Sequence, residues 1–182
     1  TDKGFDVAVL AQQVFGGHGY IWEWGVEQAV RDARITMIYE GTNGIQAMDL
    51  VGRKLPANGG RAVQAFFKMV AEEVATGKAV PETAAVAEAL EKANQQLQAA
   101  TMWLMQNAMQ NPNNAGAAAY AYMHIMGIVA TGMMWLRMAT AAQAQLNAGT
   151  GNADYLKAKL VTARYFAERI MPEAGALRRK IE

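Results

Sequence analysis

The chain contains no cysteine and no serine, and only two histidines among 182 residues. Without cysteine there can be no disulfide, thiolate metal ligand or cysteine nucleophile, and without serine a serine-hydrolase triad is impossible. The two histidines, His18 and His124, lie far apart in the sequence and outside any ligand-spaced cluster of carboxylates. We therefore expect no metal site and no hydrolase chemistry that depends on these side chains.

A strong charge of either sign is also lacking. With 17 basic and 16 acidic residues the formal net charge is +1, which favours neither nucleic acid nor an anionic membrane as a partner. The first residues show no basic region followed by a long apolar core, so no secretory signal is predicted and a cytoplasmic location is expected. The stretch 117–136 comes nearest to a membrane span, but a buried bundle helix explains it as well, and we predict no transmembrane segment.

The first 55 residues predict short helices separated by glycine-rich turns. Phe5, Ala8, Val9 and Gln12 form one helical face, which must end at Gly16 and Gly17. A second helix is expected over 24–33, with a loop at 18–22 between the two and an extended segment at 35–39. Thr42 or Asn43 can cap a third helix. That helix would carry Ile45, Met48, Val51 and Leu55.

The clearest break in the chain is PANGG at 56–60, where proline, asparagine and two glycines cannot continue a helix. Beyond it, apolar residues recur at helical spacing in four long segments, over about 63–77, 86–110, 115–147 and 153–170. Four such helices joined by short turns predict an antiparallel bundle. The predicted fold class is therefore all-α, with domains at 1–55 and 61–182 on either side of a linker at 56–60.

The long helices are rich in methionine and tryptophan, for which packing in a core or an interface is the first interpretation and an apolar binding channel the alternative. By the same interpretation, His124 is expected to be a histidine of the core. The residues concerned are Met102, Trp103, Met105, Met109, Met126, Met133, Met134 and Trp135.

Three motifs in the first half occur in a characteristic order: QVFGGHGY at 13–20, EQAVRDARI at 27–35 and IYEGTNGIQ at 38–46. This combination resembles the C-terminal helical domain of the acyl-CoA dehydrogenases over residues 1–55. The second half, mainly through KLVTARYFAERIMPEAGAL, resembles the extra helical C-terminal domain of longer members.

The resemblance implies FAD-dependent oxidation of an acyl-CoA thioester to the trans-2-enoyl-CoA, of the type used in fatty acid β-oxidation. Glu40 matches the glutamate that removes the α-proton, and Gly41 matches a position near the bound thioester. A carboxylate in an apolar pocket has a raised pKa, which suits the removal of a weakly acidic proton. Thr42 and Gly44 match positions along the FAD of the same site. Gln13, Val14, Phe15, Gly16 and Gly17 match a segment that contacts FAD held mainly by a neighbouring subunit.

The family further implies a homo-oligomer, a dimer or a tetramer, and an electron-transfer flavoprotein as electron acceptor. The chain departs from the family at Gly44, where many members carry glutamate or glutamine. Arg31 and Asp32 are expected to form a structural ion pair. Because family members place two further domains before this region, the chain is interpreted as a C-terminal portion that is inactive alone. Two alternatives remain for the bundle, an assembly module or an extension that binds the acyl chain.

Overall fold

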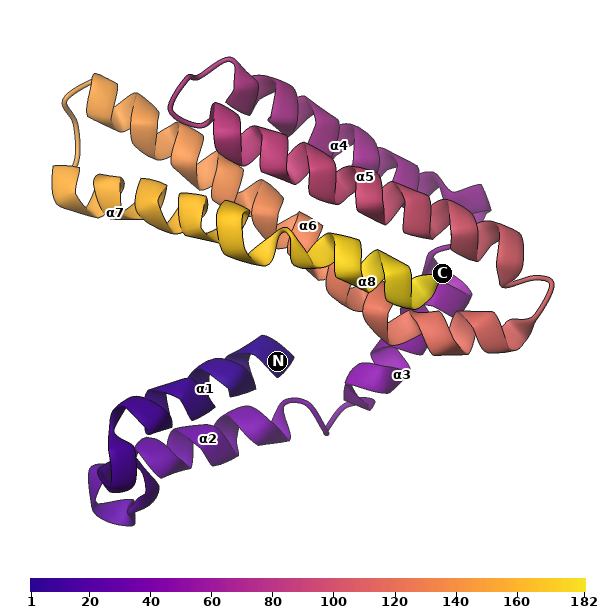
Figure 1. Ribbon diagram of the computed structural model, residues 1–182, viewed down its shortest axis with the longest axis horizontal. Helices are drawn as coiled ribbons and strands as arrows, with labels where there is room; N and C mark the ends of the chain where they lie inside the picture. The colour runs from indigo at the N-terminus through magenta and orange to yellow at the C-terminus, as the bar shows by residue number, and fades with distance from the viewer. The chain divides into compact units, whose positions relative to one another are not determined.

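The computed structural model describes all 182 residues, and every regular element in it is a helix (Figure 1). The predicted all-α fold is confirmed. The chain divides into two compact units, Thr1–Ala47 and Met48–Glu182. This division lies several residues before PANGG, and the predicted domain boundary at 56–60 remains a prediction.

The first unit is built on a helical hairpin. Two short 3-10 turns, Gly16–Tyr20 and Trp22–Trp24, join its helices α1 (Asp2–Val14) and α2 (Val26–Ile35) and occupy the segment where a loop was predicted. Phe5, Ala8 and Gln12 on the predicted face of α1 are half-buried. Neither helix of the hairpin has a fully buried residue, so the hairpin has no core of its own.

The extended segment predicted at 35–39 is wrong. Ile35 is the last residue of α2, and its carbonyl accepts hydrogen bonds from Ile38 N at 3.0 Å and Tyr39 N at 3.2 Å. The Thr36 hydroxyl donates to the Ala33 carbonyl at 2.7 Å. The preference of β-branched and aromatic residues for extended backbone is weak, and here the hydrogen bonds that close the end of the helix override it.

The third helix, α3 (Thr42–Asp49), continues into a π-helical turn at Leu50–Lys54. The Thr42 hydroxyl accepts from Ile45 N at 3.4 Å, so Thr42 acts at the helix start as predicted. Val51 and Leu55 of the predicted apolar face are buried, whereas Ile45 and Met48 are exposed. The helix break at 56–60 is confirmed, because Asn58, Gly59 and Gly60 all adopt left-handed backbone.

The second unit is the helical bundle. Its helices are α4 (Arg61–Lys78), α5 (Ala84–Asn107), α6 (Pro112–Asn147), α7 (Ala153–Tyr165) and α8 (Glu173–Ile181). Short connections make successive long helices antiparallel (Figure 1). The fourth predicted helix is interrupted: a π-helical turn at Phe166–Ile170 follows α7, and the unpredicted α8 starts after Pro172. At about 54 Å, α6 is long enough for both α7 and α8 to pack on it.

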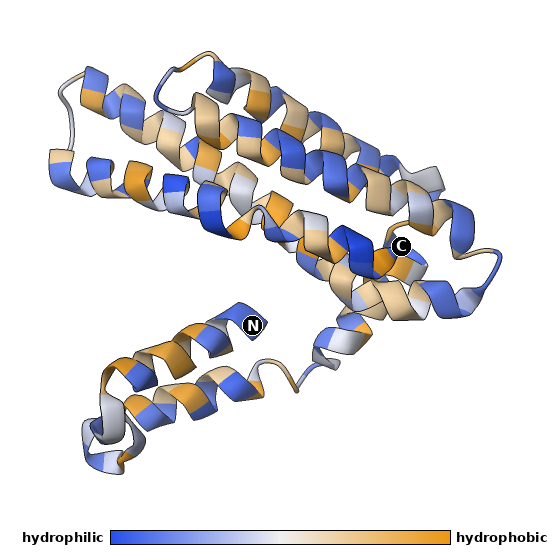
Figure 2. Ribbon diagram, in the orientation of Figure 1, coloured by the Kyte–Doolittle hydropathy of each residue, from blue (hydrophilic) through white to orange (hydrophobic).

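The bundle core contains the inward faces of α5 and α6. Leu90, Leu97 and Leu104 of α5 and Tyr122 and Leu136 of α6 are at most 1% exposed. Apolar residues follow the inward faces of these helices in Figure 2. The Thr101 and Tyr122 hydroxyls, both buried, lie 2.8 Å apart and hydrogen bond to each other. Leucines and this polar pair therefore hold the two central helices together.

By length and composition α6 is the one helix that could cross a membrane. It packs against α4, α5, α7 and α8, and 44% of its most apolar window is buried. These contacts are those of a central bundle helix, in agreement with the sequence interpretation.

The methionines and tryptophans named above, for which the sequence predicts a core or an interface, differ in their burial within the chain. Met133 is buried, whereas Met102, Met105 and Met134 on outward faces of α5 and α6, and Met109 in the turn after α5, are 40–91% exposed. A core position is therefore excluded for these four, and an interface position remains a prediction. The remaining three, Trp103, Met126 and Trp135, are half-buried. His124 is half-buried as well, and its ring centroid lies 4.6 Å from that of Tyr120.

Candidate active site

Glu40 lies in an unusual turn between α2 and α3. Three successive residues have positive φ angles: Glu40 at 52°, Gly41 at 95° and Thr42 at 54°. Residues with a Cβ rarely adopt this left-handed region, and such strain is often concentrated at functional sites. The turn presents Glu40 on the surface of the unit, as an exposed residue. The predicted base is thus held out of the hairpin rather than packed into it.

Side chains on both flanks of the turn fix its position. The Gln46 amide, one turn into α3, donates from Nε2 to the Glu40 carbonyl at 3.2 Å. Asn43 N donates to the Met37 carbonyl at 3.3 Å. The Asn43 side chain reaches the start of α1, where its Nδ2 donates to an Asp2 carboxylate oxygen at 2.8 Å. The turn is thereby attached to α1, to the end of α2 and to its own following helix.

The predicted flavin-contacting segment, Gln13–Gly17, lies where α1 ends and the first 3-10 turn begins. Val14 is 86% exposed and Phe15 47% exposed. Gly16 has φ 60°, and a Cβ at Gly17 would meet no atom of the chain within 4 Å. The backbone here is open to an approaching group, which fits a cofactor that contacts the main chain.

Thr42 and Gly44, the other two predicted flavin contacts, lie in the first turn of α3. A Cβ at Gly44 would also meet no atom within 4 Å, so this face of the helix start is open as well. The first amide groups of a helix have no partner within the helix and favour an anionic group. In α3 two of these amides already have partners, since Asn43 N donates to the Met37 carbonyl and Ile45 N to the Thr42 hydroxyl, and the open feature next to Glu40 is the backbone at Gly44.

The structure does not bring the two predicted halves of the site together. The Glu40 turn is tied through Asn43 to Asp2, at the first residue of α1, whereas Gln13–Gly17 is at the other end of that helix. Eleven residues of α-helix span about 17 Å. The two segments are therefore too far apart along α1 to contact one flavin ring together, and a role of Gln13–Gly17 in a neighbouring active site remains a prediction.

The Arg31–Asp32 ion pair is wrong. Asp32 instead accepts a hydrogen bond from Gln28 Nε2 at 2.7 Å, one helical turn earlier. Adjacent residues on a helix point about 100° apart, so they do not face each other, whereas residues at i and i+4 do. The i, i+4 spacing of Gln28 and Asp32 is visible in the sequence and could have indicated the true contact.

Two contacts near the site escaped sequence analysis. Gln12 Nε2 donates to the Gly19 carbonyl at 3.1 Å, and Gly19 is buried against α1, where a Cβ would collide with the Gln12 carbonyl, so this glycine is required for packing. Asn43, considered as a helix cap, contacts Asp2 across 41 positions of the sequence. No local pattern could have revealed that contact.

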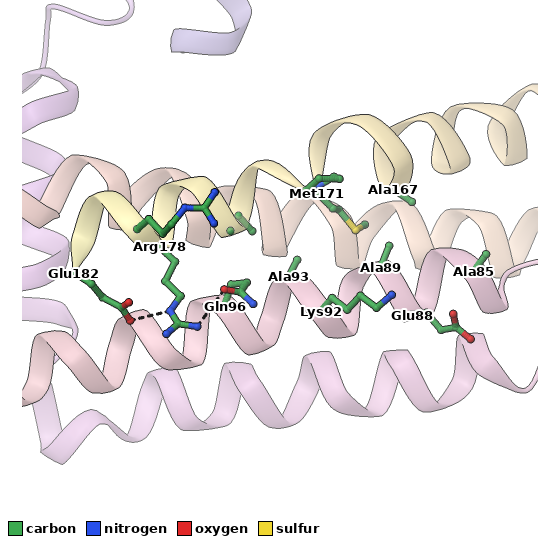
Figure 3. A pocket seen from close by; sticks show the side chains of 14 residues that line it. Ala85, Glu88, Ala89, Lys92, Ala93, Gln96, Ala167, Met171, Arg178 and Glu182 are labelled. Atoms are coloured by element: carbon green, nitrogen blue, oxygen red, sulfur yellow. Dashed lines mark hydrogen bonds and ion pairs between the residues drawn. The ribbon is translucent and has the colours of Figure 1, made fainter.

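A separate groove lies between α5 and α8, and its volume is about 650 Å³ (Figure 3). Its floor includes the small residues Ala89 and Ala93 together with Met171. Arg178 at its edge donates to Glu182 at 2.8 Å and to Gln96 at 3.4 Å. None of the predicted site residues lines it.

Comparisons with known proteins agree with the three motifs. Residues 1–55 match the family described as acyl-CoA dehydrogenase, C-terminal domain, and residues 63–182 match the family described as acetyl-CoA dehydrogenase C-terminal like. A 3-methylmercaptopropionyl-CoA dehydrogenase of Ruegeria pomeroyi is 40% identical over 97% of this chain and 30% of its own length.

Two further relatives cover the chain as fully. A broad-specificity linear acyl-CoA dehydrogenase of Mycobacterium tuberculosis is 31% identical over 100% of this chain and 31% of its own length. A butyryl-CoA dehydrogenase of Syntrophomonas wolfei is 29% identical over 94% of the chain and 28% of its own length. The chain thus spans 28–31% of the length of these relatives.

Proposed function

Because the chain belongs to the acyl-CoA dehydrogenase family, we propose that it is the helical portion of an enzyme that oxidises acyl-CoA to trans-2-enoyl-CoA, as in fatty acid β-oxidation. The observation that carries the proposal is the left-handed turn at Glu40, which presents a carboxylate beside an open helix start. A carboxylate so placed can act as a general base.

In the proposed mechanism a Glu40 oxygen forms a bond to the α-proton of the thioester as the α C–H bond breaks. Gly41, beside the base, leaves room for the thioester because it has no side chain. FAD, when bound, supplies the acceptor for the β-hydrogen, which leaves as hydride. Glu40 is left protonated, and the new double bond lies between the α and β carbons.

The other matched residues hold the cofactor. Thr42 and Gly44 offer the open first turn of α3 to FAD in the site that contains Glu40. Gln13–Gly17 contacts the FAD of a neighbouring subunit through main-chain groups and the exposed Val14 and Phe15. The separation of these segments along α1 supports a site that is shared between subunits.

A homo-oligomer, a dimer or a tetramer, is proposed on a second observation. The α1–α2 hairpin buries no side chain of its own helices, yet it exposes many large apolar residues. Among these are Val7, Leu10, Tyr20 and Trp22. Such a surface gains stability only when protein covers it. An electron-transfer flavoprotein as acceptor and a cytoplasmic location complete the proposal on the family resemblance.

An assembly role for the bundle is the second candidate function. Met102 and Met105 on the outward face of α5, and Met109 in the turn that follows it, are 41–91% exposed. Methionine is adaptable at contact surfaces, so this end of α5 is suited to subunit contact. If the chain measured alone by light scattering is monomeric at every accessible concentration, a self-association role for this surface is ruled out.

The test of the catalytic proposal is Glu40→Gln in the full-length flavin-loaded enzyme. The substitution keeps the shape of the side chain and removes the base. Turnover should therefore fall about 10²–10⁴-fold, while the flavin absorbance per protein stays constant. Glu88→Gln, at an exposed position of α5, is the matched control and should retain full activity. Turnover by Glu40→Gln within tenfold of the wild type would remove Glu40 as the base.

The 182-residue chain alone is the second arm of this experiment. Because the chain spans only 28–31% of the length of its relatives, it should purify colourless and fail to dehydrogenate acyl-CoA. Yellow colour with turnover would contradict this expectation.

A further inference from the structure

The backbone at Glu40 adopts a conformation that must be held by other contacts. Glu40 and Thr42 both carry a Cβ, yet both have positive φ angles, on either side of Gly41 at φ 95°. An isolated chain would leave this conformation, because left-handed backbone is unfavourable for such residues. The direction of the Glu40 side chain depends on the same backbone angles. A small relaxation of the turn would therefore move the carboxylate.

The Gln46 side chain lies across this turn. Its Nε2 donates to the Glu40 carbonyl at 3.2 Å, which joins α3, one turn after its start, to the residue before Gly41. A Cβ at Gly41 would lie 3.0 Å from the same nitrogen, so the amide is in contact with the middle of the turn as well. The other ties, through Thr42 and Asn43, hold the residues that follow Gly41. Gln46 is the side chain that holds Glu40 itself.

We propose that Gln46 is a positioning residue that holds the Glu40 backbone in its left-handed conformation and so aims the catalytic carboxylate. This rests on the proposed role of Glu40 as the base. Gln46 donates to the Glu40 main chain and has no hydrogen bond to its carboxylate. It acts on geometry, and a misplacement of about 1 Å can lower a rate 10²-fold.

The chemistry of the side chain explains why glutamine is suited to this position. The Glu40 carbonyl is an acceptor, so its partner must supply an N–H donor. Ionised glutamate has nearly the same shape but only acceptor oxygens, which would be repelled by the carbonyl. Methionine has a similar length and no donor. Lysine is a different shape but restores a donor on a flexible chain.

The test uses Gln46→Glu, Gln46→Met and Gln46→Lys in the full-length flavin-loaded enzyme, with kcat, KM, flavin content and thermal midpoint measured for each. The first two variants should lower kcat about 10–100-fold, with KM and flavin content within twofold of the wild type. Gln46→Lys should recover at least half of the lost activity on a logarithmic scale. Gln95→Glu, the same substitution at an exposed position of α5, should have no effect.

The outcomes separate this proposal from the one on which it rests. If Glu40→Gln is inactive and Gln46→Met keeps kcat within twofold of the wild type, the positioning role is refuted and the base is not. If Glu40→Gln remains active, both proposals are refuted. Equal losses of kcat, flavin and thermal midpoint in all three variants, Gln46→Lys included, would show that Gln46 merely stabilises the fold.

Discussion

The buried hydroxyl pair between α5 and α6 allows a quantitative prediction of the free energy of unfolding and its dependence on pH. Tyr122 is 0% exposed, and its hydroxyl lies 2.8 Å from that of Thr101. Thr101 also donates to the Leu97 carbonyl at 2.8 Å. Burial raises the pKa of Tyr122 from 10.0 to about 12, and the hydrogen bond with Thr101 opposes this only in part. Tyr122→Phe removes the hydroxyl and keeps the ring.

At pH 8 the substitution should lower the free energy of unfolding by about 1 kcal/mol. This is the net value of one buried hydrogen bond, because Thr101 retains the Leu97 carbonyl as a partner. Thr101→Val should cost more, about 1–3 kcal/mol, since it leaves the Tyr122 hydroxyl buried without its partner.

The difference between wild type and Tyr122→Phe should then change with pH. Between pH 10 and about 12 the folded chain keeps the Tyr122 proton that the unfolded chain releases. The folded state binds more protons there, so the wild-type free energy of unfolding falls as pH rises, by roughly 1.4 kcal/mol per pH unit at most. Phenylalanine has no ionisable hydroxyl, so this loss of stability with pH is absent from Tyr122→Phe. The wild-type advantage of about 1 kcal/mol should therefore vanish near pH 11 and reverse above it.

Urea unfolding of the 182-residue chain, followed by circular dichroism at a series of alkaline pH values, measures this difference directly. Tyr165→Phe, at a residue 59% exposed, is the control. The difference in free energy of unfolding between wild type and this variant should not change with pH. A wild-type advantage over Tyr122→Phe that stays constant from pH 8 to pH 11.5 would refute the argument that burial controls this tyrosine.

Two further substitutions test the core and the flavin-contacting segment. Leu97→Ala, at a residue 0% exposed between α5 and its neighbours, should lower the free energy of unfolding by about 2–5 kcal/mol; a urea titration giving less than 1 kcal/mol would contradict the assigned core. Gly17→Val places a side chain where no atom of the chain lies within 4 Å, so thermal unfolding of the chain should change little while flavin content of the full-length enzyme falls; unchanged flavin content would argue against main-chain contact at Gly17.

The helices were predictable because their apolar residues recur at helical spacing. In the bundle, Leu90, Leu97 and Leu104 of the predicted stripe are buried. The features that were missed depend on local breaks and hydrogen bonds, which the spacing of apolar residues does not reveal. A π-helical turn at Phe166–Ile170 interrupts the last predicted helix, and the unpredicted α8 begins directly after Pro172. Residues 35–39 favour extended backbone by composition, but hydrogen bonds to the end of α2 decide their conformation.

The site illustrates a different limit of sequence reasoning. The motif around Glu40 predicts the site residue from a local string, and the glycine between Glu40 and Thr42 marks a special backbone conformation. The local sequence could not predict the hydrogen bond between Asn43 and Asp2, or the one that Gln46 donates to the Glu40 carbonyl. These bonds hold three left-handed residues in succession. The physical reason for the motif is therefore as much the shape of the turn as the carboxylate it carries.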